Sequence, residues 1–212
     1  MSDINELIAR WNTDEGKPYK GSLIDRDSYT DGNLSCMCAQ GQVLHVIGGW
    51  TADELTDAEQ THADKETAKL LNISRTHAIL LRIVNDKRDG APAIVLTNPG
   101  KVLGDQWSTV LDFWWHIDTL DADGWRKVSS AWDAAWDAAG TAALDAAWDA
   151  AWDVAWAVAW DAAGTAARDA AREIQGAEIL KRDGKPFVFL PMFGFASPDE
   201  IPARPADYGV VK

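Results

Sequence analysis

Hydrophobic residues recur three or four positions apart along most of this chain, and this spacing predicts a mostly α-helical protein. Residues 3–11 form a short amphipathic pattern of this kind. Residues 12–33 are rich in Asp, Gly, Asn, Ser and Lys, so we expect a loop there before the next helix.

Polar residues that favour helix starts divide the pattern that follows. Ser35 is expected to cap a helix over residues 35–46, which the Gly-Gly pair behind it ends. Thr51, with Glu54 three residues later, matches a capping box, and Asp57 can cap the same helical pattern a second time. The sequence therefore predicts at least two helices in this stretch.

The next stretch predicts two further helices separated by a loop. Ser74 can cap a helix whose apolar side chains face a core, residues 85–92 are expected to form a turn or loop, and Asn98 with Pro99 marks the start of another helix. That last helix carries an apolar stripe at i, i+3 and i+4 spacing, made of Val102, Leu103, Trp107, Val110, Leu111, Trp114 and Trp115.

From about residue 121 the pattern becomes a tandem Ala-Trp-Asp repeat with a period of four residues, ending near residue 180. Its phase is marked by Trp132, Trp136, Gly140, Leu144, Trp148, Trp152, Trp156, Trp160, Gly164, Arg168 and Arg172. Alanine favours helix, so we predict α-helix here. Each four-residue step advances about 40° beyond a full turn, so one flat buried face cannot cover every tryptophan of a continuous helix.

Two glycines decide how this repeat folds. An unbroken helix over residues 122–180 would be about 90 Å long, whereas a compact chain of this size has a radius of gyration of roughly 17 Å. We therefore expect breaks near Gly140 and Gly164, which give stacked antiparallel helices. In the alternative, both glycines stay helical and let another helix approach closely.

These patterns divide the chain into three segments: a helical N-terminal domain at 1–120, the repeat helices at 121–182, and a C-terminal arm at 183–212. Prolines and glycines make the arm irregular, with at most a short strand at 185–191. The fold class is mostly α, with the arm lacing the two helical parts together.

Charge and composition limit the classes of partner that the protein can bind. The formal net charge is −13, which argues against binding to nucleic acid and is compatible with a basic host protein as partner. No apolar run of about 18 residues lacks charge, so we predict no membrane span. The lack of a signal-peptide pattern and the presence of only two cysteines predict a cytoplasmic protein, in the host cytoplasm if it is phage-encoded.

The repeat supplies the first candidate site. Aromatic stripes at helical spacing usually belong to a core, but a tryptophan surface could also stack on a ligand or grip a partner. The predicted binding residues are Trp148, Trp152, Trp156, Trp160, Asp149 and Asp153, with Arg82 available to hold a small anionic ligand.

A second, catalytic hypothesis uses the cysteines. Cys36 or Cys38 at a helix N-terminus could be a nucleophile, with His77 as base and Asn85 or Asp86 orienting it, as in a papain-like enzyme. In the alternative, both cysteines are buried structural thiols. Cys-x-Cys is not a standard zinc spacing, so we predict no metal site, and the absence of phosphate-binding or metalloprotease motifs predicts no cofactor.

Three short motifs resemble those of small phage and actinobacterial proteins without an assigned activity. They are Lys20-Gly21 followed by Arg26-Asp27, Cys36-x-Cys38-Ala39-x-Gly41, and Asn85-Asp86. The tandem Ala-Trp-Asp-Ala run is similar to runs in phage proteins as well. The resemblance implies a phage or bacterial source and a helical N-terminal domain, and it carries over no catalytic residue.

The sequence leaves four functions open. The leading hypothesis is a non-enzymatic, acidic interaction protein, phage-encoded and acting on a host factor. The alternatives are a small-molecule or nucleotide-binding protein with a Trp-lined pocket, the papain-like cysteine enzyme, and a virion structural component. The oligomeric state is left open.

Overall fold

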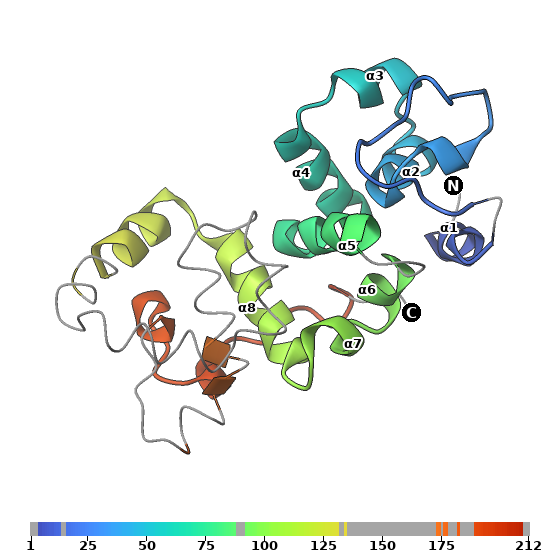
Figure 1. Ribbon diagram of the computed structural model, residues 1–212. Helices are drawn as coiled ribbons and strands as arrows, with labels where there is room; N and C mark the ends of the chain where they lie inside the picture. The colour runs from blue at the N-terminus through green and yellow to red at the C-terminus, as the bar shows by residue number, and fades with distance from the viewer. Residues whose placement is uncertain are drawn as a thin grey trace. The chain divides into compact units, whose positions relative to one another are not determined.

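The fold is described from a computed structural model (Figure 1). The structure describes residues 4–13, 16–87, 92–131 and 189–209, together with residues 134, 173, 174, 176, 177 and 182. Most of these residues are helical. The β-structure among the described residues is one isolated antiparallel bridge, between Ile24 and Met37. The predicted mostly α fold class is confirmed.

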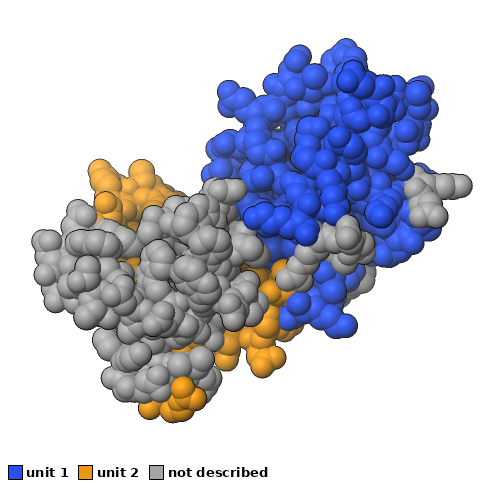
Figure 2. Space-filling view, viewed as in Figure 1, with its two compact units in different colours: residues 1–101, 207–212 blue, residues 102–206 orange. Residues whose placement is uncertain are grey.

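The chain forms two compact units (Figure 2). The first comprises residues 1–101 and 207–212, and the second comprises residues 102–206. These bounds differ from the three segments drawn from the sequence, because residues 189–206 belong with residues 102–120 in one unit. The last residues of the tail, 207–212, are grouped with the first unit.

The first unit is a cluster of short helices. They are α1 (Ile4–Trp11), α2 (Ala39–Val46), α3 (Ala52–Asp57), α4 (Gln60–Leu71), α5 (Arg75–Lys87) and α6 (Pro92–Thr97), with the 3-10 turn η1 (Leu34–Cys36) before α2 (Figure 1). Helices α2, α4 and α5 contact one another, α3 contacts α2, and α6 contacts both α5 and α1. The core lies where α2, α4 and α5 meet, and its buried side chains include Val43, Leu44, Leu71, Ile79, Leu80 and Val84.

The start of α2 differs from the prediction. Ser35 lies within η1, and Cys38 is the residue that caps α2. The cause is Met37, which is extended (φ −115°, ψ 139°) and forms the bridge to Ile24. This bridge separates the 3-10 turn η1 from α2, so α2 begins only after its cap, Cys38.

The capping box at the start of α3 is confirmed. The Thr51 hydroxyl accepts the Glu54 N–H at 3.2 Å, and Glu54 Oε2 accepts the Thr51 N–H at 2.7 Å. Asp57 does not act as a second cap, because it is the last residue of α3. The next helix starts after Ala58 and Glu59, which are extended, and Glu59 makes no side-chain cap bond.

Helix α5 begins as predicted and ends later than predicted. The Ser74 hydroxyl accepts the His77 N–H at 3.0 Å, as expected of a helix cap. Residues 85–87, predicted to open a loop, remain helical. Asn85 is held there because its amide group bonds two backbone groups outside α5, the Ala39 N–H at 3.3 Å and the Tyr19 carbonyl at 2.7 Å.

The predicted helix from Asn98 onward is interrupted. It forms α7 (Gly100–Leu103) and α8 (Trp107–Thr119), separated by Gly104 in the left-handed conformation (φ +77°). Glycine adopts this conformation without the steric cost that a side chain imposes, so it ends α7. Residues 122–131 continue the second unit as helix.

The second unit has its own core around α8. The Phe113 ring meets the Phe193 ring edge-on at 4.9 Å. The fully buried Glu173 accepts the backbone N–H groups of Phe189 and Leu190 at 2.8 and 2.7 Å. These bonds hold the start of the 3-10 helix η2 (Leu190–Phe193). Helix η2 begins within the last two residues of the strand predicted at 185–191. Residues 185–188 lie outside the described residues.

Arg204 fastens the tail to α8. Its guanidinium donates to Asp112 Oδ1 at 2.5 Å and to the Ser108 carbonyl at 2.9 Å, and it lies 5.7 Å from the centre of the Trp107 ring. Together the ion pair, the backbone bond and the cation-π contact explain why this part of the tail belongs to the second unit.

The tandem repeat falls almost entirely outside the described residues. Within residues 132–172, the structure describes only Ala134. The predicted helix breaks at Gly140 and Gly164 and the burial of the repeat tryptophans therefore stay predictions. Among the helices that are described, none combines the length and the apolar character that crossing a membrane requires.

Candidate functional site

The two cysteines are buried structural thiols rather than exposed nucleophiles. Cys36 donates its S–H to the Asn33 carbonyl at 3.0 Å, and Cys38 Sγ accepts the Gly41 N–H at 3.4 Å at the start of α2. Burial raises the pKa of Cys36, and it raises the pKa of Cys38 to about 11. Desolvation therefore outweighs the helix N-terminus, which alone would favour the thiolate.

The other residues of the catalytic hypothesis make hydrogen bonds that hold parts of the fold together. His77 is fully buried, and its Nε2 lies 2.8 Å from the Val95 carbonyl oxygen, which ties α5 to α6. Asp86 Oδ1 accepts the Gly21 N–H at 3.0 Å and an Asn85 side-chain N–H at 3.0 Å. Asn85 and Asp86 thus fix the Lys20-Gly21 turn against α5, which is a structural task.

We expect both cysteines to react with iodoacetamide more slowly than a free thiol at neutral pH, because the thiolate is the reactive form and burial disfavours it. Mass spectrometry of the native protein over time, with urea-unfolded protein as control, measures this. Native labelling faster than that of the unfolded control would restore the enzyme hypothesis.

Arg82 is paired with an internal acid. Its Nε lies 3.6 Å from Asp64 Oδ1, and the same oxygen accepts side-chain N–H groups of Gln40 at 2.9 Å and Gln60 at 3.0 Å. The Asp64 side chain is only 4% exposed. Because its charge is already matched by a carboxylate, Arg82 is poorly suited to the predicted role of holding an anionic ligand.

The remaining predicted binding residues cannot be placed. Trp148, Trp152, Trp156, Trp160, Asp149 and Asp153 all lie outside the described residues.

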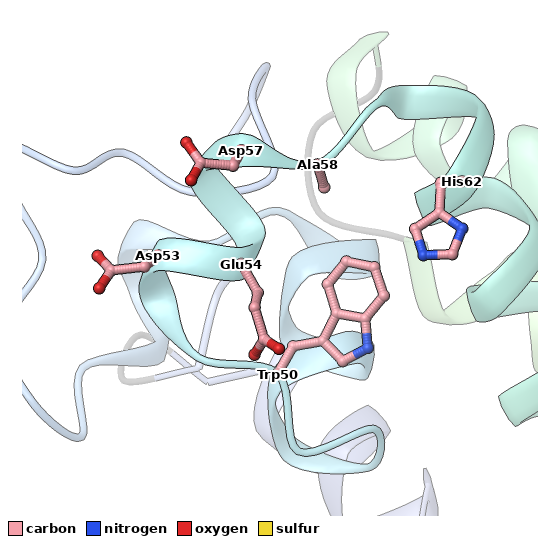
Figure 3. Close-up of a pocket in the computed structure, with 6 residues that line it drawn as sticks. All are labelled: Trp50, Asp53, Glu54, Asp57, Ala58 and His62. Carbon is pink, nitrogen blue, oxygen red and sulfur yellow. The ribbon is translucent and has the colours of Figure 1, made fainter.

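A pocket that the sequence did not suggest lies at the surface of the first unit. It has a volume of about 350 Å³ and is lined by Trp50, Asp53, Glu54, Asp57, Ala58 and His62 (Figure 3). We call it the Trp50 pocket. Its residues come from the turn before α3, from α3 itself, from the break between α3 and α4, and from the first turn of α4.

An aromatic pair forms one wall of the Trp50 pocket. The rings of Trp50 and His62 are stacked, with centroids 5.4 Å apart and planes 27° from parallel. Trp50 is positioned by α2, because its carbonyl oxygen lies 2.6 Å from His45 Nδ1 and its N–H donates to the Leu44 carbonyl at 3.0 Å. The indole is thus presented at a fixed place on the surface.

Three carboxylates of α3 line the pocket beside this aromatic wall. Figure 3 shows the Glu54 carboxylate turned back toward Trp50, with those of Asp53 and Asp57 directed outward from α3. Asp53 forms an ion pair with Arg26. Asp57 has no hydrogen bond or ion pair with any residue in the part of the chain that the structure describes. The rim of the pocket is therefore acidic, with one carboxylate unpaired.

Glu54 is held ionised by the capping box. Its Oε2 accepts the Thr51 N–H and the Thr51 hydroxyl at 2.8 Å, and these bonds lower the pKa of Glu54 from its ordinary 4.5. Because the pKa of Glu54 is lowered in the folded protein, ionised Glu54 stabilises the fold fully above the ordinary pKa. This contribution to stability is lost as pH falls through the lowered pKa. Glu54 therefore carries its negative charge throughout the neutral range.

Replacing Thr51 by valine is expected to raise the pKa of Glu54 toward 4.5, because it removes the hydroxyl donor while keeping the side-chain size. An NMR titration of the Glu54 carboxyl carbon reads this directly. Thr119→Val, in the other unit, is the control and should leave Glu54 unchanged. An unaltered pKa in Thr51→Val would show that the backbone bond alone depresses it.

The Trp50 pocket had a weak signal in the sequence. Asp53 and Asp57 are four residues apart on one helix and follow a tryptophan that stands outside the repeat. His62 could not be assigned to the site, because its stacking on Trp50 depends on the bend at Ala58 and Glu59.

No protein family, curated protein or solved structure matches this chain. The residues that the structure describes include no group of three or more His, Cys, Asp or Glu side chains arranged to hold a metal ion. The geometry of the Trp50 pocket indicates its chemistry: an aromatic wall, an acidic rim and an opening to solvent.

Proposed function

We propose that this protein is a non-enzymatic interaction protein that binds a basic partner protein through the Trp50 pocket. The resemblance of its motifs to those of phage proteins supports a phage origin and a host factor as that partner. The observation that carries the proposal is an aromatic wall, made by Trp50 and His62, bordered by the carboxylates of Asp53, Glu54 and Asp57.

Charge supports this choice at two length scales. The whole chain has a formal net charge of −13, which attracts a basic protein at long range and accelerates encounter. At short range the pocket offers both carboxylates and an indole, which bind cationic side chains by ion pairing and by cation-π attraction. The same two features oppose a nucleotide or another anionic ligand at this place.

The absence of exposed nucleophiles among the candidate residues also favours binding over catalysis. Cys38 and His77 are both fully buried, and each is bonded to backbone groups. An interaction function needs no group of this kind.

Titration with a fluorescently labelled hexa-lysine peptide, followed by anisotropy, tests the proposal. We expect binding that weakens steeply as salt is raised, because screening removes the attraction between surface charges. A neutral hexa-glutamine peptide is the control. The proposal fails if the lysine peptide does not bind at low salt or binds no better than the control.

A further inference from the structure

We propose that the Trp50 pocket receives the guanidinium group of one arginine side chain of the basic partner. This inference rests on the proposed function and adds the identity of the side chain that is recognised. Its basis is the combination of a flat aromatic wall with an unpaired carboxylate, Asp57, at the rim.

The second unit of the same protein shows how such a group is bound. The Arg204 guanidinium lies 5.7 Å from the centre of the Trp107 ring, and it also bonds Asp112 at 2.5 Å. An indole and a carboxylate thus hold a guanidinium from two directions. The Trp50 pocket is lined by the same two kinds of group, the Trp50 indole and the Asp57 carboxylate.

A second arginine, Arg26, limits which carboxylates of the pocket can accept a cation from the partner. Arg26 lies 5.6 Å from the centre of the Tyr29 ring and pairs with Asp53 at the pocket rim. Asp53 is therefore already neutralised, and Glu54 is bonded twice by Thr51. Asp57 is left as the acceptor for an incoming cation, with Glu54 contributing charge at longer range.

The stacking of His62 defines the shape of the ligand. A flat ring already lies near-parallel to the indole, at 27°, so this wall accommodates planar groups. In Figure 3 the indole stands between the His62 ring and α3, with the Glu54 carboxylate close to it and the Asp57 carboxylate directed away from both rings. Asp57 is exposed and lines the same pocket, so its side chain must turn toward the indole to meet the ligand. Guanidinium is planar and stacks on aromatic faces while it bonds a carboxylate with a second edge.

Other cations fit this geometry less well. A quaternary ammonium group is best held by a cage of several aromatic rings, and of the described residues that line this pocket only Trp50 and His62 are aromatic. The lysine ammonium is a compact, strongly hydrated charge that gains less from stacking on one flat wall. The pocket therefore favours arginine over lysine.

The test compares three labelled peptides by anisotropy: hexa-lysine, the same peptide with one central arginine, and the same peptide with one central citrulline. Citrulline keeps the shape of arginine without its charge. We expect the arginine peptide to bind wild-type protein about fivefold more tightly than hexa-lysine, and the citrulline peptide to bind more weakly than either.

Variants locate the effect. Trp50→Ala and Asp57→Asn should abolish the fivefold preference for arginine, and Trp50→Phe should keep part of it. Asp31→Asn is the matched control, because this substitution removes the same charge as Asp57→Asn. Asp31 is exposed in the same unit and lies outside the pocket. This control should keep the full preference. If Trp50→Ala fails to fold, Asp57→Asn alone decides, since no described bond depends on that side chain.

The outcomes separate the inference from the proposed function. If hexa-lysine binds but arginine gives no gain, or if Asp31→Asn and Asp57→Asn lose the gain equally, the arginine site is wrong while the interaction function stands. If no basic peptide binds, the proposed function itself fails.

Discussion

Replacing Gly41 by alanine is expected to destabilise the first unit by about 3 kcal/mol, because there is no room for a side chain. A Cβ at this position would overlap the Leu23 carbonyl oxygen, and it would lie 3.0 Å from the Leu23 carbonyl carbon and 3.3 Å from Met37 Cβ. The obstacle is backbone, and that backbone is fixed because the Leu23 carbonyl also accepts the Cys38 N–H at 3.2 Å. The loop must move away from α2 before alanine fits.

Urea unfolding followed by circular dichroism measures this loss, and hydrogen exchange of the α2 amides assigns it to the first unit. Gly124→Ala is the matched control. Gly124 is helical, and the nearest atoms to a new Cβ there belong to the Leu120 and Asp121 side chains, at 3.1 Å and beyond. That variant should change stability by less than about 1 kcal/mol. Equal effects in the two variants would contradict the account of Gly41.

Replacing Gln42 by glutamate is expected to cost about 3 kcal/mol or more, although the two side chains have nearly the same size. Gln42 is fully buried, and its Nε2 group donates to three backbone carbonyls, those of Gly16 at 3.2 Å, Leu34 at 2.9 Å and Met37 at 3.2 Å. Its Oε1 accepts the Trp11 indole N–H at 3.0 Å. A carboxylate would turn a donor into an acceptor facing three carbonyl oxygens.

The control for this substitution is Gln106→Glu. Gln106 occupies the N-cap of α8 without a side-chain cap bond, and a negative charge near a helix start is tolerated. We expect little change there by urea unfolding. If Gln42→Glu is equally harmless, the loop over residues 16–37 is not held by this side chain.

Local signals in the sequence predicted several features of the fold correctly. The capping box of Thr51 and Glu54 and the cap at Ser74 involve residues three positions apart, so the sequence alone contains both partners. The amphipathic pattern over residues 3–11 is likewise local, and α1 forms there.

Features that depend on distant contacts were not predictable. Ser35 does not cap α2, because Met37 is extended in its bridge to Ile24 and separates η1, which contains Ser35, from α2. Asn85 stays helical because it bonds backbone groups of Tyr19 and Ala39, far earlier in the chain. In both cases tertiary contacts override a sound local preference.

The candidate site illustrates the same limit. The sequence draws attention to the repeat tryptophans, since they are numerous and periodic, and Trp50 shows no such pattern. What makes Trp50 a candidate is its contact with His62 and its place beside the carboxylates of α3. These contacts follow from the bend between α3 and α4, where the sequence offered Asp57 as a second cap but did not predict the extended residues Ala58 and Glu59.

The cysteine hypothesis shows why residue types alone are insufficient. Cys38 does lie at a helix start, as predicted, and the helix N-terminus favours a thiolate. Burial acts in the opposite direction and wins, since the pKa of the thiol rises to about 11. Exposure, which the sequence does not encode locally, decides between nucleophile and core residue.

The most direct test of the Trp50 pocket as a cation site is an NMR titration with the single-arginine peptide, observing the Trp50 indole N–H and the His62 ring. We predict that these two signals and the α3 amides shift first and saturate together, with Asp31 and its neighbours unaffected. Uniform small shifts over the acidic surface, or the absence of shifts at Trp50 and His62, would contradict the account.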